Sequence, residues 1–97
     1  MFSFEWDEAK SRINVQKHGI SFEEASTVFL DEDALLRSDP DHSDDEERFV
    51  ILGLSAEVRL LVVVHCYRGE NDRIRIISAR KATKHEAQTY INQYGED

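Results

Sequence analysis

Two adjacent residues, Lys17 and His18, have side chains suited to acid–base chemistry at a phosphate. A histidine titrates near neutral pH, and a neighbouring lysine can hold the negative charge of the phosphate. The same residues also suit the last turn of a helix, where the helix dipole favours cations, before the left-handed stop that Gly19 permits. The pair therefore has two interpretations, a catalytic pair and a capped helix end.

Arginines supply a second group of candidates. Arg48 opens a predicted strand directly after Glu47, and its planar guanidinium can clamp a phosphate or lie in solvent at the strand end. A basic stripe, residues 73–84, has no acidic residue and five basic ones: Arg73, Arg75, Arg80, Lys81 and Lys84. Such a stripe can bind an anion, or it can form surface ion pairs with the acidic residues elsewhere in the chain.

The positions of these arginines along a predicted strand set a geometric condition. Strand alternation places Arg73 and Arg75 on one face of the sheet and Arg80 on the other. Arg75 and Arg80 therefore converge only if a β-bulge or bend lies between them, or if Arg80 lies beyond the strand.

Two ring-bearing residues have both a chemical and a structural interpretation. His65 lies beside Cys66 on an apolar strand, where it is either a titrating base or a hydrogen-bonded core residue. Trp6 either packs as a lid on the core or offers a stacking surface for a nucleobase. The sequence leaves both choices open.

The net charge of −8 is distributed unevenly along the chain. Residues 31–47 have nine acidic residues and one arginine, so eleven basic and eleven acidic residues balance in the remainder. Phosphate binding needs clustered lysine and arginine, which a net acidic composition disfavours. Because the basic stripe is separate from the acidic segment, local anion binding stays compatible with the composition.

The sequence lacks the patterns that are typical of metal-binding, membrane-spanning and secreted proteins. The histidines do not have the spacing of metal ligands and Cys66 is a lone cysteine, so we predict no metal and no cofactor. The longest apolar run, residues 60–64, is far shorter than the roughly 20 residues of a membrane span. The N-terminus lacks the pattern of a signal peptide, so we expect a cytoplasmic protein without a membrane partner.

Two helices are predicted in the N-terminal third. The first runs from about Asp7, as its N-cap, to Lys17. Its apolar stripe is thin: Ala9, Ile13 and Gln16. The second opens with Ser21 and Glu24 at the spacing of a capping box and ends near Leu30. Its core face has four apolar residues: Phe22, Ala25, Val28 and Phe29.

Apolar runs further along predict about four strands in a meandering antiparallel sheet. These strands cover residues 34–37, 48–54, 59–67 and 73–79. Loops are predicted for residues 38–46 and 69–72. Thr83 and Glu86 repeat the capping-box spacing and open a last helix that Gly95 ends. The chain is therefore predicted to be a single α+β domain, residues 1–97, with two N-terminal helices, this sheet and one C-terminal helix.

Taken together, four segments resemble the BrnT family of toxins. They are FEWDEAKSRINVQKHGISFEEASTVF (residues 4–29), DPDHSDDEERFVILG (39–53), LLVVVH (60–65) and RIRIISARKATKHE (73–86). The combination of WDEAK, N-x-x-KHGI-x-F-x-x-A and RIISARKAT is highly specific, and the segments cover most of the chain in family order.

The resemblance implies a RelE-like α+β fold and a ribonuclease that slows translation. It also implies a cognate antitoxin of the BrnA type, in which a toxin-binding segment is joined to a ribbon–helix–helix module, so that DNA is contacted only through the antitoxin. RNA is the implied substrate, cleaved by a metal-independent endoribonuclease that uses a base, an acid and cations at the phosphate. The implied catalytic candidates are Lys17, His18, Arg48, His65, Arg75 and Arg80. The substrate-binding candidates are Trp6, Arg73 and Lys81.

An alternative function belongs to a different class, a non-catalytic toxin-like module that binds the antitoxin as a corepressor. A purified protein that leaves RNA intact yet binds its antitoxin favours this alternative. The basic stripe is one candidate for the antitoxin interface, because covering it blocks RNA and neutralises charge.

Overall fold

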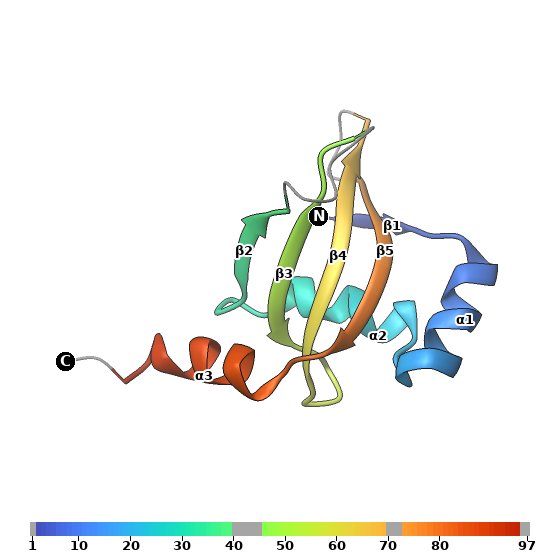
Figure 1. Cartoon of the computed structure of the whole chain (residues 1–97). Helices are drawn as coiled ribbons and strands as arrows, with labels where there is room; N and C mark the ends of the chain where they lie inside the picture. Colours follow the sequence, from blue (N-terminus) through green and yellow to red (C-terminus); the bar gives the residue numbers. More distant parts are fainter. Residues whose placement is uncertain (1, 40–45, 70–72, 96–97) are drawn as a thin grey trace.

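The middle of the molecule is a sheet with the strand order β1-β5-β4-β3-β2 (Figure 1). The structure is a computed structural model that describes residues 2–39, 46–69 and 73–95. Its strands are β1 (Ser3–Glu5), β2 (Leu35–Ser38), β3 (Phe49–Leu54), β4 (Leu60–Arg68) and β5 (Arg73–Lys81). Its helices are α1 (Glu8–His18), α2 (Phe22–Thr27), the short 3-10 helix η1 (Val28–Leu30) and α3 (Lys84–Asn92).

The α+β prediction is confirmed, with one added strand. The four predicted strands pair antiparallel as β2–β3, β3–β4 and β4–β5. β1 was not predicted, and it pairs parallel with β5 through residues 3–5 and 73–75, which makes the sheet mixed. A strand of three residues is too short for an alternating pattern to be recognised.

One face of the sheet is covered by α2 and η1, and we call it the closed face. Alternation along β4 points Leu61 and Val63 into this face, while Val62 and Val64 point to the other. The core consists of apolar side chains from both layers: Ile20, Phe22, Ala25, Val28, Ile51, Leu61, Val63, Ile74, Ile76 and Ala79. Full burial of a large aliphatic side chain contributes about 1.5–3 kcal/mol, so this face carries most of the stability.

The other face, which we call the open face, has less cover. α3 leaves the end of β5 and extends away from the strands (Figure 1). Its Tyr90 packs on Leu52 and Val62 in a small second cluster. Two nearby side chains, Ile91 and Tyr94, are each 56% exposed. The open face therefore keeps partly exposed aliphatic side chains beside charged ones.

The outer edge of β5 is completed by a side chain instead of a strand. β1 reaches only as far as Arg75, and beyond it the buried Asn14 of α1 takes over. The Asn14 Oδ1 accepts a hydrogen bond from the Ala79 N–H (3.2 Å), and its Nδ2 donates to the Ala79 carbonyl (2.9 Å). The side-chain amide thus satisfies the donor and acceptor that a neighbouring strand would satisfy.

The helix ends follow the predicted capping residues, with one difference. Asp7 accepts hydrogen bonds from two first-turn amides of α1, and Gly19 ends this helix with φ of 73°. The reciprocal capping box is present at Thr83. At Ser21 the predicted box is incomplete, because the side chain of Glu24 binds other partners.

The predicted apolar stripe of α1 is wrong. Ile13, which was placed at its centre, is 59% exposed, and the buried residues of this helix are Ser11 and Asn14. Both have polar groups bonded to neighbouring backbone, so α1 packs through short hydrogen-bonding side chains instead of through aliphatic ones.

The loops predicted for residues 38–46 and 69–72 fall largely on residues 40–45 and 70–72, which lie outside the described residues. Among the described helices, none combines the length and the apolar composition that crossing a bilayer requires.

Candidate functional site

A cleft on the open face brings together three of the residues predicted to do chemistry. It is lined by His18 at the end of α1, Arg48 directly before β3, and Arg80 in β5. Its volume is about 380 Å³. The remaining side chains of its wall include further polar groups over an aliphatic floor: Arg37, Asp39, Val50, Val62, Val64, Ile77, Ser78 and Ala79. The cleft therefore combines a histidine with three arginines.

The floor of the cleft follows from the register of four strands. Cross-strand neighbours form two rows on the open face. The first row is Arg37, Val50, Val64 and Ser78, and the second is Leu35, Leu52, Val62 and Arg80. At about 4.8 Å between strands, the two ends of a row lie roughly 14 Å apart. Arginines stand at opposite ends of the two rows, so cations flank an aliphatic floor.

A β-bulge in β5 determines which arginines share a face. Val64 pairs with Ser78, whereas the next residue of β4, His65, pairs with Ile76, so Ile77 is an extra residue in β5. This extra residue reverses the alternation, and it places Arg80 on the same face as Arg75. The condition stated for these two arginines is met.

Sharing a face does not bring the two arginines into one site. Their partners on β4, Cys66 and Val62, are four residues apart, so a strand rise of about 3.3 Å per residue separates the two arginines by roughly 13 Å. The Arg75 guanidinium donates to Glu5 in β1 at 2.9 Å, and Arg75 does not line the cleft. Arg73 lies further along the same face and also pairs with Glu5, at 3.6 Å. Glu5 therefore holds these two arginines away from the cleft.

Arg80 is held at the cleft by a carboxylate of α3. Two of its nitrogens donate to the two oxygens of Glu86, at 2.8 and 2.9 Å, and one also donates to the Lys81 carbonyl. The hydrogen bonds from Arg80 lower the pKa of Glu86 to about 2. A guanidinium has five N–H donors, so two remain for a ligand, and an incoming phosphate competes with Glu86 for the charge.

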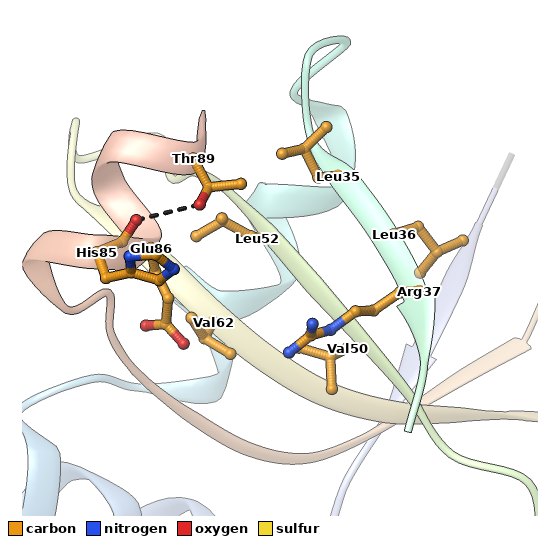
Figure 2. Close-up of a pocket in the computed structure, with 9 residues that line it drawn as sticks. All are labelled: Leu35, Leu36, Arg37, Val50, Leu52, Val62, His85, Glu86 and Thr89. Carbon is orange, nitrogen blue, oxygen red and sulfur yellow. Dashed lines mark hydrogen bonds between the residues drawn. The ribbon is translucent and has the colours of Figure 1, made fainter. Parts of the chain in front are cut away.

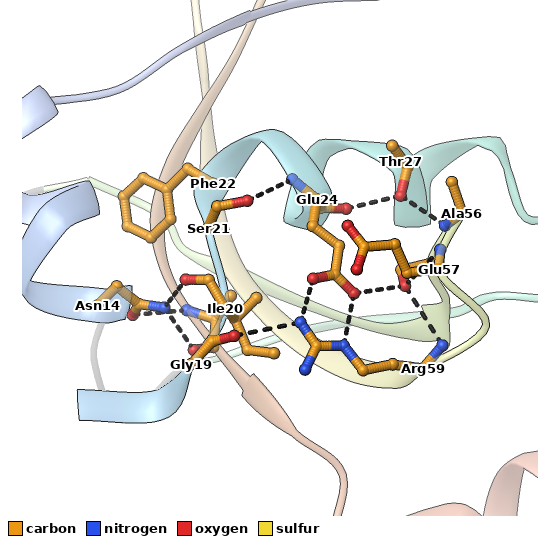
Figure 3. A network of polar contacts seen from close by, with 12 residues as sticks. Asn14, Gly19, Ile20, Ser21, Phe22, Glu24, Thr27, Ala56, Glu57 and Arg59 are labelled. Atoms are coloured by element: carbon orange, nitrogen blue, oxygen red, sulfur yellow. Dashed lines mark hydrogen bonds and ion pairs between the residues drawn. The ribbon is translucent and has the colours of Figure 1, made fainter. Parts of the chain in front are cut away.

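Polar contacts of Gly19 and Ile20 hold the end of α1, where His18 is the last helical residue (Figure 3). Next to it, the Gly19 carbonyl accepts a hydrogen bond from Arg59 (3.1 Å), and Arg59 forms an ion pair with the buried Glu24. Glu24 also accepts from the Ser55 hydroxyl at 2.7 Å, and the guanidinium holds its pKa below the usual range. These contacts fix the end of the helix, and therefore its half-buried histidine, against the β3–β4 turn.

Asn14 joins the two walls of the cleft that carry His18 and Arg80. Besides its two bonds to Ala79, its Nδ2 donates to the Ile20 carbonyl at 2.8 Å (Figure 3). Ile20 lies two residues after His18, and Ala79 directly precedes Arg80. One buried side chain therefore sets the separation of the two segments that supply the histidine and the arginine.

His65 lies on the closed face, away from the cleft. Its side chain is fully buried, and its Nδ1 lies 3.1 Å from the Val63 carbonyl. The ring packs edge-on against Phe29 (4.8 Å between centroids), and Phe49 and Tyr67 also contact it. Burial lowers the pKa of His65, so the ring is neutral near pH 7. This is the environment of a core residue.

The remaining candidates lie at other positions. Trp6 packs on the closed-face core, with its ring centroid 6.2 Å from that of Phe22. Its indole nitrogen is buried and has no hydrogen-bond partner among the described residues. Lys17 and Lys81 are exposed and do not line the cleft. The structure thus gathers His18, Arg48 and Arg80, and separates them from the other predicted residues.

Three lining residues were missed by sequence reasoning: Arg37, Asp39 and Ser78. Arg37 follows Leu35 by two residues, which places both on one face of β2, and this signal was present in the sequence. Asp39 reaches the cleft because its N–H donates to the Arg48 carbonyl at 2.8 Å across the β2–β3 pair. That pairing spans residues far apart in the chain, so no local pattern reveals it.

Among the residues that the structure describes, no group of three or more His, Cys, Asp or Glu side chains is arranged to hold a metal ion.

Comparison with known proteins matches this chain to a family and to a solved structure. The profile of a family described as the ribonuclease toxin BrnT of type II toxin–antitoxin systems matches residues 6–86. The crystal structure of the Brucella abortus ribonuclease toxin BrnT is similar to this chain with a TM-score of 0.62 at 22% identity, covering 87% of this chain and 100% of that one. No curated protein matches the sequence. At 22% identity the structural similarity shows the fold, and the match to the family profile shows the family.

Proposed function

This chain belongs to the BrnT family of ribonuclease toxins of type II toxin–antitoxin systems, and we propose that it cleaves RNA in the open-face cleft. The observation that carries the proposal is the convergence of His18, Arg48 and Arg80 around one cavity. These three residues come from distant parts of the chain, and the sequence predicts each of them as a catalytic candidate. A histidine beside several arginines fits a phosphodiester as the bound group.

The proposed reaction is attack of a ribose 2′-oxygen on the adjacent phosphorus. His18 takes the proton of the 2′-hydroxyl or returns a proton to the leaving 5′-oxygen. Arg48 and Arg80 offset the charge that develops on the phosphate oxygens, with Arg37 as a further cation at the opposite end of the floor. These groups supply acid–base chemistry and charge, so the proposed activity is independent of metal ions.

A type II toxin has an antitoxin partner, and we propose that the partner here is a BrnA-like protein with a ribbon–helix–helix module. DNA binding by the pair would then come from the antitoxin, in agreement with the net charge of −8 on this chain. The proposed site of action is the cytoplasm, where RNA is the substrate.

The test is cleavage of single-stranded RNA by purified protein, with and without EDTA. We expect His18→Ala and Arg80→Ala each to reduce cleavage by about 10²-fold or more, with no effect of EDTA. Arg73→Ala is the matched control, because Arg73 lies on the same strand and face as Arg80 but outside the cleft. Growth of a host that expresses each variant, with and without the antitoxin gene, gives the second measurement.

Two outcomes would contradict the proposal. Full cleavage by folded Arg80→Ala protein would remove the cleft as the site. Wild-type protein that leaves RNA intact while binding its antitoxin would favour the corepressor function instead. Activity lost on EDTA treatment and restored by a divalent cation would overturn only the metal independence.

A further inference from the structure

A second cavity lies beside the cleft on the open face, between the sheet and α3 (Figure 2). Its volume is about 250 Å³. The floor consists of aliphatic side chains from three neighbouring strands, Leu35, Leu52 and Val62. His85 and Thr89 of α3 stand over one side of it, as Figure 2 shows. The cavity therefore has an apolar floor and a polar rim.

The cavity is a neighbour of the cleft. Arg37, Val50 and Val62 line both, so the two hollows share one stretch of wall. Arg37 is exposed, and it makes no ion pair with any described residue. A phosphate held in the cleft thus has the apolar cavity beside it. The cavity would therefore bind the group that is attached to this phosphate.

The chemistry of the cavity fits a flat ring with polar edges. An apolar floor favours the face of such a ring, because contact removes hydrocarbon surface from water. The Thr89 hydroxyl donates to the His85 carbonyl at 3.1 Å, which leaves its oxygen to accept a hydrogen bond, and the His85 ring adds a second polar group. Glu86 is also on the rim, but its charge is offset by Arg80.

The size of the cavity decides between ligands. Cavities for drug-sized molecules have volumes of about 300–1,000 Å³, so about 250 Å³ suits one ring system. A docked protein segment needs a longer groove with several side-chain pockets. The volume, the apolar floor and the neighbouring cations together favour a nucleotide over a peptide.

We propose that this cavity is a base pocket, which binds the nucleobase attached to the phosphate in the cleft. The inference rests on the proposed ribonuclease function and adds to it the subsite that holds the substrate beside the scissile bond. The base lies against Leu35, Leu52 and Val62, and its edge faces His85 and Thr89. Binding there gives the enzyme a preference among bases at one position.

The test is direct binding of small probes to the whole chain. Ribose 5-phosphate and the four ribonucleoside 5′-monophosphates are titrated separately, followed by calorimetry and by NMR shifts of the Leu35 and Leu52 methyl groups, which line the cavity but not the cleft. We expect at least one nucleotide to bind about tenfold more tightly than ribose 5-phosphate, and only nucleotides to shift these methyl groups. Equal affinities with unshifted methyl groups would overturn the base pocket.

A filling variant separates the pocket from the cleft. Thr89→Trp should remove the nucleotide advantage while ribose 5-phosphate binds as before. Gln88→Trp is the matched control, because Gln88 is the neighbouring residue of α3 but does not line the cavity. Thr89→Trp protein that keeps its nucleotide preference but escapes neutralisation by the antitoxin would overturn the proposal and assign the cavity to protein docking.

The experiment also distinguishes failure of the base pocket from failure of the proposed function. If the two kinds of probe bind equally and their affinity falls in Arg80→Ala, the cleft stands and the base pocket is wrong. If neither kind of probe binds to folded protein, both proposals are overturned.

Discussion

The two faces of the central sheet are built from the same strands but differ in their cover. On the closed face, α2 and η1 bury aliphatic side chains such as Leu61 and Val63 completely. On the open face, Val64 is only half-buried, and arginines stand on either side of it. One side of each strand therefore stabilises the fold, and the other is free to bind a ligand.

The comparison shows why a continuous apolar strand is ambiguous as a signal. Val62, Val63 and Val64 alternate between the faces, so one valine is in the closed core and two line the cleft. Identical side chains have different tasks because their neighbours differ. Substitutions on the two faces should therefore have different effects.

The largest expected effect is on the closed face. Leu61→Ala removes a fully buried side chain and should lower the free energy of unfolding by about 2–5 kcal/mol. Leu35→Ala removes the same atoms from the half-buried floor of the open face and should cost about 1 kcal/mol. Urea unfolding of both variants measures the difference. Equal losses would contradict the division between a structural and an open face.

The next effect concerns Asn14, which joins α1 to the edge of β5. Asn14→Ala leaves three buried backbone groups without their partners and should cost about 2–3 kcal/mol. RNA cleavage should fall further than the folded fraction does, because His18 and Arg80 lose their common anchor. Ser11→Ala is the control, since Ser11 is buried on the same helix but accepts one long bond of 3.4 Å. Proportional losses of folded protein and activity would make Asn14 purely structural.

Sequence periodicity predicted the elements of both faces but not how they meet. The α+β class, the helix caps at Asp7 and Thr83, and the core face of α2 follow from patterns within a few residues. The bulge at Ile77 was named only as a condition, because strand register depends on pairing between distant residues. Polar residues at the cleft depend on the same register, and so no local pattern separates them from ordinary surface residues.

Asn14 shows a second limit of sequence reasoning. A polar residue in a helix is ordinarily placed on the solvent side, and the apolar Ile13 is placed in the core. The reverse holds here, because α1 lies against a strand edge that offers hydrogen bonds instead of a hydrophobic surface. The sequence does not indicate whether a helix will pack against a hydrophobic surface or against the edge of a strand.

A smaller effect should separate His65 from the histidine of the cleft. Burial lowers the pKa of His65 below its unfolded value of about 6.5, so the unfolded state binds the proton more readily. Its contribution to stability is therefore complete above pH 6.5 and is lost as the pH falls toward the folded pKa, by up to about 1.4 kcal/mol per pH unit. His65→Leu should flatten the dependence of the unfolding free energy on pH below 6.5, while leaving RNA cleavage near the wild-type rate.

The titration of carboxylates does not interfere with this measurement of His65. The pKa values of Glu24 and Glu86 are lowered from 4.5, so their contributions to stability are lost only at more acidic pH. An unchanged slope above pH 5 in His65→Leu would show that another group carries the dependence. Loss of cleavage in this variant with stability intact would return His65 to the catalytic residues.

The smallest expected effect on stability, at Glu86, gives the sharpest contrast between the faces. Glu86→Gln removes the ion pair with Arg80 while a side-chain oxygen can still accept from the Thr83 N–H. Since the carboxylate is 24% exposed, solvent screens the pair, and the expected loss is about 1 kcal/mol or less at pH 7. Because the pKa of Glu86 is about 2, wild-type and variant stabilities should converge as the pH falls from 4.5 toward 2.

The same substitution should strengthen anion binding, because the Arg80 guanidinium no longer has a carboxylate partner. We expect ribose 5-phosphate to bind several-fold more tightly to Glu86→Gln than to wild type, measured by calorimetry at low salt. Thr83→Ala is the matched control, since it costs about 1 kcal/mol of stability in the same helix, through loss of the N-cap, and leaves the ion pair in place. A residue that stabilises the fold while weakening the site is expected only on the open face, where structure and ligand compete for one charge. Unchanged phosphate affinity in Glu86→Gln would mean that Arg80 only holds α3 and does not bind the phosphate. The proposed chemistry of the cleft depends on Arg80 as a cation, so it would then be contradicted.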